Sequence, residues 1–126
     1  RPLRAPPWRP ARHFPRPGRV LDVGCAAGYF LSVMQQEGWQ VVGYEPSDAI
    51  RAQAQERLRG AAVHGGALEA APLEPGSFDL VSFWDVIEHV PDPIQTLRFV
   101  RRLLKPGGKL LIETQNVQSR AAKWMG

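Results

Sequence analysis

Short apolar runs alternate along the chain with longer segments in which apolar residues recur every three or four positions. A short apolar run bounded by glycine or polar residues predicts a buried strand, whereas the three-to-four spacing predicts an amphipathic helix. The predicted strands are Val20–Val23, Val41–Glu45, Ala61–His64, Phe78–Trp84 and Lys109–Glu113. The residues from Thr114 to Gly126 begin a new segment that predicts no clear element.

Three helices are predicted between these strands, and each has a boundary signal. Gly38 and Gly60 suit the ends of the first two helices. Ser47 can cap the second, and Pro93 suits the first turn of the third. The predicted ranges are Tyr29–Glu37, Ser47–Arg59 and Pro93–Leu104. The positions predicted to be buried are Phe30, Val33 and Met34, then Ile50, Ala54 and Leu58, then Ile94, Leu97, Val100 and Leu104.

Strands that alternate with helices through short loops predict an α/β fold with a parallel sheet and right-handed crossovers. The chain of 126 residues suits one domain. We expect residues 19–126 to form this domain and residues 1–18, rich in proline and arginine, to be a poorly ordered leader.

The net charge of +4 comes from the N-terminal end, because six arginines, five of them in this leader, precede the first acid, Asp22. The other residues carry ten basic and twelve acidic side chains, which argues against a nucleic-acid partner. No apolar run approaches the roughly 18 residues that span a bilayer. The single cysteine, Cys25, excludes an internal disulfide and fits a reducing compartment. We expect a cytoplasmic protein, and the sequence indicates no oligomeric state.

The first strand leads through Gly24-Cys25-Ala26-Ala27-Gly28 into a helix. Such a turn leaves backbone N–H groups and the positive end of a helix dipole free for a ligand. Glycines at 24 and 28 permit a tight turn, and Ala26 departs from the G-x-G-x-x-G pattern of nicotinamide sites. A purely structural turn is the alternative.

The segment Val20–Gly28 resembles motif I of the class I S-adenosylmethionine-dependent methyltransferases. Three further segments match the family's order, at Glu45, at Gly66-Ala67-Leu68, and from Phe78 to Leu110. The nearest subgroup contains the ubiquinone-biosynthesis O-methyltransferases, and the resemblance covers about Arg19 to Thr114. It implies a Rossmann-like, doubly wound sheet of order 3-2-1-4-5. The family normally adds two more strands, one antiparallel, and we expect this chain to be C-terminally truncated and to lack them.

The resemblance also implies where S-adenosylmethionine would bind and S-adenosylhomocysteine would remain. Glu45 would accept hydrogen bonds from the ribose hydroxyls, and Pro46 would flank the adenine. Relatives often carry an acid in place of Ala67 that pairs with the adenine amino group, and here only the Leu68 N–H remains to meet the ring. Glu69 would substitute only in a register shifted by two. The full set of expected cofactor contacts is Asp22, Gly24, Cys25, Ala26, Gly28, Tyr29, Phe30, Glu45, Pro46, Ala67, Leu68, Phe83 and Trp84.

Asp85, Glu88 and His89 form the one local cluster of titratable residues, and three roles compete. The cluster can be structural. His89 can be a general base facing the acceptor, because a histidine titrates in the useful range. The three can instead hold a divalent metal, as the similar acid-x-x-Glu-His pattern does in small-RNA 2′-O-methyltransferases and some quinone O-methyltransferases. We favour no metal and assign His89 as the candidate catalytic residue.

The resemblance implies methyl transfer from S-adenosylmethionine to a small-molecule acceptor, at oxygen. Methyl transfer from a sulfonium needs mainly alignment and exclusion of water, so the catalytic machinery can be sparse. Two alternatives remain open at this point. One is a cofactor-binding module or fragment without turnover, and the other is an RNA methyltransferase guided by the basic leader.

Overall fold

A computed structural model of the chain describes residues 13–115 and 120–125, and the side chains as far as Glu113. The strands are β1 (Arg19–Val23), β2 (Gln40–Tyr44), β3 (Ala62–His64), β4 (Phe78–Trp84), β5 (Leu104–Gln115) and β6 (Arg120–Met125). The helices are α2 (Tyr29–Gln36), α3 (Asp48–Arg57) and α4 (Pro93–Leu103), with short 3-10 helices η1 (Leu68–Ala70) and η2 (Ile87–His89). Among the described residues, no helix is both long and apolar enough to cross a membrane.

The strands form one sheet of order β3-β2-β1-β4-β5-β6. The first five strands in this order are parallel, which confirms the predicted 3-2-1-4-5 arrangement. β6 runs antiparallel along β5, with Leu111 opposite Trp124, and the sequence did not predict it. The carboxyl ends of β1, β2, β3 and β4 therefore meet at one edge of the sheet, where open α/β sheets bind their ligands.

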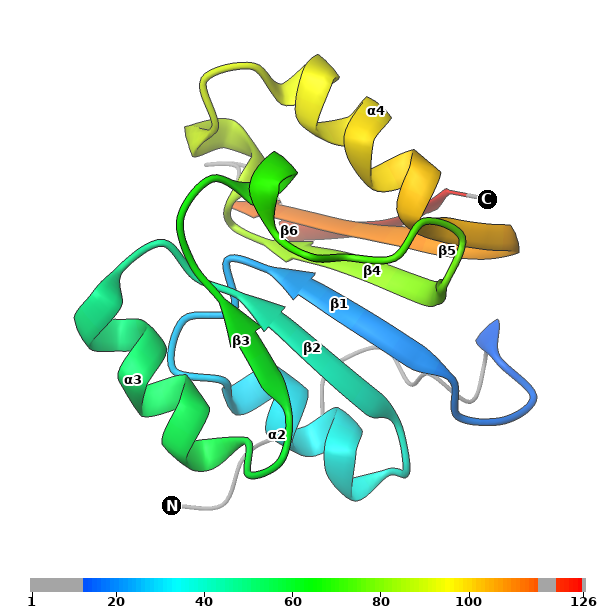
Figure 1. Cartoon of the computed structure of the whole chain (residues 1–126). Helices are drawn as coiled ribbons and strands as arrows, with labels where there is room; N and C mark the ends of the chain where they lie inside the picture. Colours follow the sequence, from blue (N-terminus) through cyan, green and yellow to red (C-terminus); the bar gives the residue numbers. More distant parts are fainter. Residues whose placement is uncertain (1–12, 116–119, 126) are drawn as a thin grey trace.

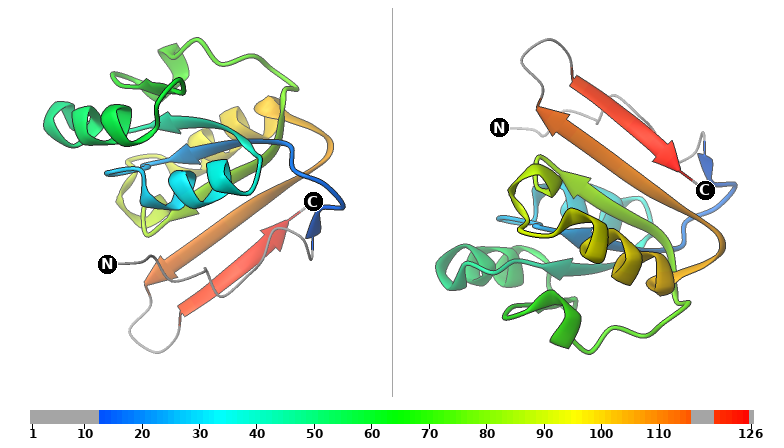
Figure 2. Two further views of the ribbon diagram at one scale, coloured as in Figure 1. Left: turned by 90° about the horizontal axis from the view of Figure 1, so that it is seen from below. Right: turned by 90° about the horizontal axis from the view of Figure 1, so that it is seen from above.

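Helices cover both faces of the sheet (Figures 1 and 2), and each face has its own core. On one face, Leu31 and Met34 of α2 and Ala54 of α3 pack against β1, β2, β4 and β5. On the other face, Val100 and Leu103 of α4 pack against β1, β2 and β4. The sheet is thus buried on both sides, which explains why its strands are continuous apolar runs.

The boundary signals of the helices are confirmed in the structure. Ser47 caps α3 and accepts a hydrogen bond at its Oγ from the Ile50 N–H (3.4 Å). Pro93 begins α4, and the Asp92 carboxylate caps it by accepting from the Gln95 N–H (3.1 Å). A proline at the first helical position loses no hydrogen bond, because that N–H has no partner within the helix.

Two of the predicted buried positions are wrong. Ile50 is 39% exposed and Ile94 is 64% exposed, because each lies in the first turn of its helix. The buried face of α4 instead runs through Thr96, Val100 and Leu103, at i, i+4 and i+7. Leu104, predicted as the last buried position of α4, is the first residue of β5.

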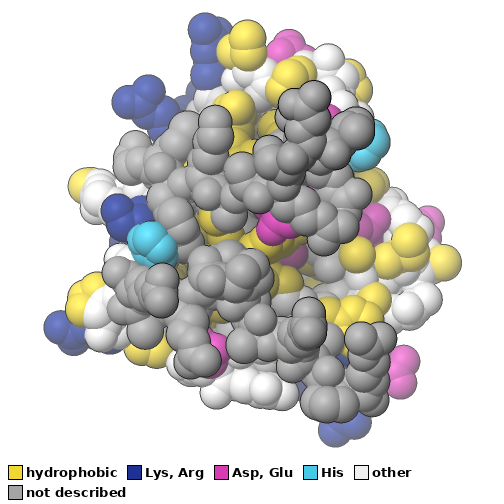
Figure 3. Space-filling view, turned by 180° about the vertical axis from the view of Figure 1, so that it is seen from behind, with side chains coloured by type: hydrophobic (Ala, Val, Ile, Leu, Met, Phe, Trp, Pro, Cys, Tyr) yellow, Lys and Arg dark blue, Asp and Glu magenta, His cyan; other side chains and the backbone are white. Residues whose placement is uncertain are grey.

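Residues 1–12 of the predicted leader lie outside the described residues. The last part of the leader contacts the domain. The Phe14 ring meets the buried Trp39 ring edge to face, with centroids 5.0 Å apart. At least this residue of the predicted leader therefore packs on the domain. On the face seen in Figure 3, the described Lys and Arg side chains lie at the rim, mostly on the left of the view.

Candidate functional site

The loop from β1 to α2 is built from left-handed backbone at every second residue. Gly24, Ala26 and Gly28 have φ of 79°, 52° and 87°. The N–H groups of Gly24 and Cys25 both donate to the Tyr44 carbonyl, at 2.8 and 2.9 Å, which ties the loop to the end of β2. Alternating backbone of this kind suits a negatively charged group, and here the Ala26 N–H donates to the Glu45 carboxylate (3.0 Å).

Helix α2 begins directly after this loop. Gly28 is its N-cap and makes no side-chain cap hydrogen bond. The first N–H groups of a helix have no carbonyl partner within the helix. A Cβ at Gly28 would lie 3.2 Å from Leu58 Cδ1, so the loop packs directly on α3. A Cβ at Gly24 would lie 2.5 Å from Val86, which brings the segment after β4 against the same loop.

Glu45 follows β2 and is only 8% exposed. Its Oε1 accepts from the Ala26 N–H (3.0 Å) and its Oε2 accepts from the Ser47 N–H (2.9 Å). A carboxylate has about four acceptor positions, so each oxygen keeps one for a ligand hydroxyl. The acid that the sequence singled out is thus fixed beside the glycine loop.

Asp22 lies on β1, is 2% exposed, and accepts a hydrogen bond from the Ser82 hydroxyl (2.8 Å). Burial, together with the nearby Glu45 charge, raises its pKa to about 8, against the opposing effect of the Ser82 hydrogen bond. Burial first, and then the charges of Asp22 and Glu45, raise the pKa of the Cys25 thiol to about 12. Cys25 is therefore a neutral buried side chain rather than a nucleophile.

A cavity of about 480 Å³ opens beside these residues, at the carboxyl ends of β1 and β2. Its walls come from β1, β2, η1, the segment after β4, and the beginning of α4. The lining residues are Val23, Gly24, Tyr44, Pro46, Ala67, Leu68, Glu69, Val86, His89, Val90, Pro91, Asp92, Gln95 and Thr96. The lining is mostly apolar with a few polar groups, as in small-molecule sites.

The structure brings some of the expected cofactor residues together at this cavity and leaves others beside it. Gly24, Pro46, Ala67 and Leu68 line the cavity, as does the candidate base His89. The remaining expected contacts are not among its lining residues, namely Asp22, Cys25, Ala26, Gly28, Tyr29, Phe30, Glu45, Phe83 and Trp84. Cys25, Ala26, Gly28 and Glu45 belong to the loop contacts described above, Asp22 lies on β1 one residue before the lining residue Val23, and Tyr29 is 50% exposed on α2.

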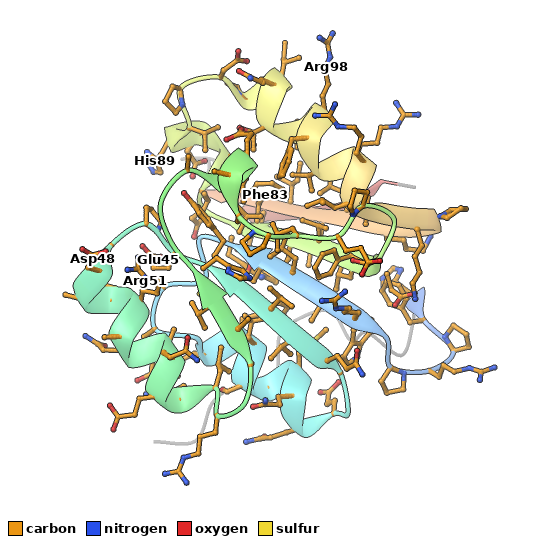
Figure 4. All side chains as sticks on the ribbon, in the orientation of Figure 1. Glu45, Asp48, Arg51, Phe83, His89 and Arg98 are labelled. Atoms are coloured by element: carbon orange, nitrogen blue, oxygen red, sulfur yellow. The ribbon has the colours of Figure 1, made fainter. Side chains whose placement is uncertain are left out.

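The two aromatic residues at the end of β4 have different environments. Phe83 is fully buried in the core under α4 (Figure 4), so its side chain does not face the cavity. Trp84 is partly buried on the opposite face and packs against the Phe30 ring, with centroids 5.0 Å apart. Their predicted place beside the methionine end of a cofactor stays a prediction.

The acid–histidine cluster lies on and before η2. Asp85 has left-handed backbone (φ 55°), and its N–H donates to the Glu113 carbonyl (2.8 Å). The His89 side chain is 78% exposed, and its Nε2 lies 3.8 Å from Glu88 Oε1. Over the residues whose placement is described, no three His, Cys, Asp or Glu side chains are grouped as a metal site requires.

Sequence reasoning missed several cavity residues, because tertiary packing brings them there. Tyr44 is one of them: its hydroxyl donates to the Gly66 carbonyl and so holds the loop after β3. Its pKa is raised by burial and by the charges of Glu69 and Glu45. Gln95 and Thr96 come from α4, and the one available signal was their place in the first turn of that helix.

Comparison with known proteins agrees with this geometry. A family model described as a methyltransferase domain matches residues 3–126. The chain is 36% identical over 108 residues to the ubiquinone biosynthesis O-methyltransferase of Pseudomonas aeruginosa, covering 82% of this chain and 47% of that protein. It is 38% identical over 107 residues to the protein of the same name from Sodalis glossinidius, covering 81% and 43%. The chain thus spans about half the length of the curated relatives it matches.

Solved structures give the same result. A Pyrococcus horikoshii protein superposes with a TM-score of 0.74 at 30% identity, covering 85% of this chain and 53% of that one. Phosphoethanolamine N-methyltransferase 2 of Haemonchus contortus, solved with S-adenosylmethionine, superposes with a TM-score of 0.70 at 31% identity, covering 79% and 24%. The chain therefore belongs to the class I S-adenosylmethionine-dependent methyltransferase family.

Proposed function

We propose that this chain binds S-adenosylmethionine at the carboxyl edge of its sheet and serves methyl transfer to the oxygen of a small-molecule acceptor. The observation that carries the proposal is the Glu45 carboxylate. Backbone N–H groups of Ala26 and Ser47 hold it beside a left-handed glycine loop, and its chain neighbours Tyr44 and Pro46 line a cavity of about 480 Å³. A carboxylate so held presents free acceptor positions to two neighbouring hydroxyls, as on a ribose.

The residues around Glu45 fit the remaining parts of the cofactor. Pro46, Ala67 and Leu68 line the cavity together and offer apolar surface to an adenine ring. The uncapped first turn of α2 offers N–H groups to the carboxylate of the methionine part. Asp22 is a buried acid on β1, two residues before Gly24, and its carboxyl would accept from the ammonium group of the methionine part. Bound there, the cofactor would supply a methyl group already activated by the positive sulfur.

Transfer to oxygen is supported by the relatives, which are named as O-methyltransferases. A hydroxyl acceptor must lose its proton, and a general base typically contributes about 10²- to 10⁴-fold to such a step. His89 lines the cavity with a largely exposed imidazole, and we assign it that role. The chain's part in the reaction is then to align donor and acceptor and to accept one proton at the His89 imidazole.

A cofactor-binding module without turnover is the second candidate, and one observation favours it. Ala67 lines the cavity where relatives often carry an acid, so the chain presents no carboxylate there to the adenine amino group. Binding of the cofactor is common to both candidates. Turnover with a phenolic acceptor and labelled S-adenosylmethionine separates them, because a binding module releases no methylated product.

Calorimetric titration of the full chain with S-adenosylhomocysteine tests the shared part of the proposal. We expect the wild-type chain to bind with a micromolar dissociation constant. In Glu45→Gln, which keeps one acceptor oxygen but loses the charge, we expect the affinity to fall by more than about tenfold. Glu56→Gln is the matched control, because Glu56 is an exposed glutamate on α3. A folded wild-type chain that does not bind would overturn the proposal, as would equal losses in the two variants.

A further inference from the structure

Arg51 lies in the second turn of α3, and its guanidinium turns back over the end of β2. Its Nη1 donates to the carbonyl oxygens of Glu45 (3.0 Å) and Pro46 (3.5 Å). Its Nη2 donates to Asp48 Oδ1 (2.7 Å). Figure 4 shows Glu45, Asp48 and Arg51 gathered where β2 leads into α3. One side chain thus binds three residues of this connection, Glu45, Pro46 and Asp48.

The guanidinium also lies against the loop after β3. A Cβ at Gly65 would stand 2.1 Å from Arg51 Nη1, so only a glycine leaves the guanidinium in place. The neighbouring Gly66 carbonyl is held from the other side by the Tyr44 hydroxyl. Arg51 therefore joins the ends of β2 and β3, the two strands that lead to the proposed ribose and adenine positions.

The ion pair with Asp48 does not explain this arrangement. The Asp48 side chain is 92% exposed, and exposed pairs typically contribute little to stability. The hydrogen bonds from Arg51 to the Glu45 and Pro46 carbonyls differ from this ion pair, because they bind the main chain. The pairing of β2 with β3 ends where the Glu45 N–H donates to the His64 carbonyl (2.9 Å). Beyond that point, the Arg51 guanidinium donates to the carbonyls of Glu45 and Pro46. Asp48 orients the fork of the guanidinium for that purpose.

We infer that Arg51 is a positioning residue for cofactor binding, which sets the Glu45 carboxylate and the Pro46 ring by holding their main-chain carbonyls. The inference rests on the proposed function, because it assigns the ribose to Glu45. Two N–H groups fix the carboxylate end of Glu45, and Arg51 fixes its main-chain end. Without Arg51 the main-chain carbonyl of Glu45 is no longer held. The Glu45 carboxylate then takes several orientations, and only some of them can accept from both ribose hydroxyls.

A ligand–variant cycle tests this role. The probes are S-adenosylhomocysteine and its 2′-deoxy analogue, which lacks one hydroxyl that Glu45 would accept from. For the wild-type chain we expect the analogue to bind about tenfold more weakly, the equivalent of one well-placed hydrogen bond to a charged group. For Arg51→Gln we expect the affinity for S-adenosylhomocysteine to fall by about tenfold, and the affinity for the analogue to fall by less than about threefold.

Two further variants separate geometry from charge and from folding. Arg51→Lys keeps the charge but not the planar fork, so we expect it to behave as Arg51→Gln does. Arg59→Gln removes the same charge from an exposed position just after α3, so we expect wild-type values. An equal loss of affinity for both ligands in Arg51→Gln would overturn the inference. A general disturbance of the structure would lower both affinities alike, whether or not the 2′-hydroxyl is present.

Amide hydrogen exchange of the ligand-free chain keeps the two proposals distinguishable. We expect Arg51→Gln to speed exchange at the Ala26 and Ser47 amides, which donate to Glu45, by about tenfold, with the Leu21 amide inside β1 unchanged. If the wild-type chain fails to bind S-adenosylhomocysteine, the proposed function falls, and this exchange measurement still decides whether Arg51 holds Glu45. Unchanged exchange at both amides would overturn the inference by itself.

Discussion

The Ser82 hydroxyl on β4 donates a 2.8 Å hydrogen bond to the Asp22 carboxyl on β1, across the centre of the sheet. This bond favours the charged form of Asp22, yet burial outweighs it and raises the pKa of Asp22 from 3.8 to about 8. The folded chain consequently holds this proton at pH values where the unfolded chain has lost it. The next prediction follows from that difference.

Stability should depend on pH through Asp22. Because the pKa of Asp22 is higher in the folded state than in the unfolded state, its proton contributes to the free energy of unfolding. This contribution is fully present below about pH 4 and is lost as the pH rises through 8. Asp22→Asn is neutral throughout and should remove this loss. Urea unfolding of both proteins at pH 5, 6.5 and 8 should show that the free energy of unfolding of the wild-type chain falls with pH relative to that of the variant. Parallel curves would contradict the prediction.

Ala26→Gly should stabilise the chain. Ala26 has φ 52°, and left-handed backbone costs a residue with a Cβ about 1–2 kcal/mol, part of which is offset by the greater flexibility of glycine when unfolded. We expect a net gain of about 0.5–1 kcal/mol by urea unfolding. The Ala26 N–H to Glu45 hydrogen bond belongs to the backbone and should persist. Ala27→Gly is the control, because Ala27 is not in the left-handed region, and it should give no gain.

Ala67→Asp should strengthen cofactor binding. Ala67 lines the cavity, and an aspartate there could accept from the adenine amino group. One such bond is worth about 0.5–1.5 kcal/mol, so we expect S-adenosylhomocysteine to bind about 2- to 12-fold more tightly by calorimetry. The inosine analogue, which lacks the amino group, should gain nothing. Ala70→Asp adds the same charge to η1 at an exposed residue that does not line the cavity, and it should bind as the wild type does.

Phe83→Leu should separate packing from cofactor contact. Phe83 is fully buried under α4, so its replacement leaves a small cavity and we expect a loss of about 1–2 kcal/mol in unfolding free energy. Because the ring does not line the cavity, the affinity for S-adenosylhomocysteine should stay within about twofold of the wild-type value. A tenfold loss of affinity in a stably folded variant would mean that the ring does contact the cofactor.

His89→Gln should lower turnover and leave cofactor binding unchanged. If His89 accepts the proton of a phenolic acceptor, we expect kcat to fall by about 100-fold, with S-adenosylhomocysteine affinity within about twofold of wild type. Glu88→Gln is the control for loss of the neighbouring group, which lies 3.8 Å away. Equal kcat values for His89→Gln and wild type would leave His89 without a chemical role.

Much of the fold follows from the sequence, because a sheet covered on both faces is made of continuous apolar strands. The predicted range of β4 matches the structure residue for residue, since Phe78, Leu80, Val81 and Phe83 are all buried. Ser47 and Pro93 are equally clear, because capping depends on neighbours three residues away. β6 was not predicted, although β5 ends only five positions before it begins, because the sequence of Arg120–Met125 is not a continuous apolar run.

The candidate site could be predicted only where it lies on a strand end or in the glycine loop. Glu45 was singled out from its place at the end of the second strand and from the family resemblance, and its role at the ribose stays a prediction. Tyr44, Val86 and Thr96 reach the cavity through packing between segments far apart in the chain. Arg51 was missed for the same reason, because its importance depends on Gly65 lying beneath its guanidinium. Such relationships carry no periodic signal.

The central position of β1 has a consequence for the order of folding. Val20 pairs on one side with Val41 and on the other with Leu80, so the strand is completed only when a segment sixty positions later has joined it. The glycine loop then closes against Val86, later still. Pairings over such separations form slowly, because a long loop must be closed first. We therefore expect the loop beside Glu45 to take shape late in folding, and we expect a ligand at this site to slow unfolding rather than to speed folding.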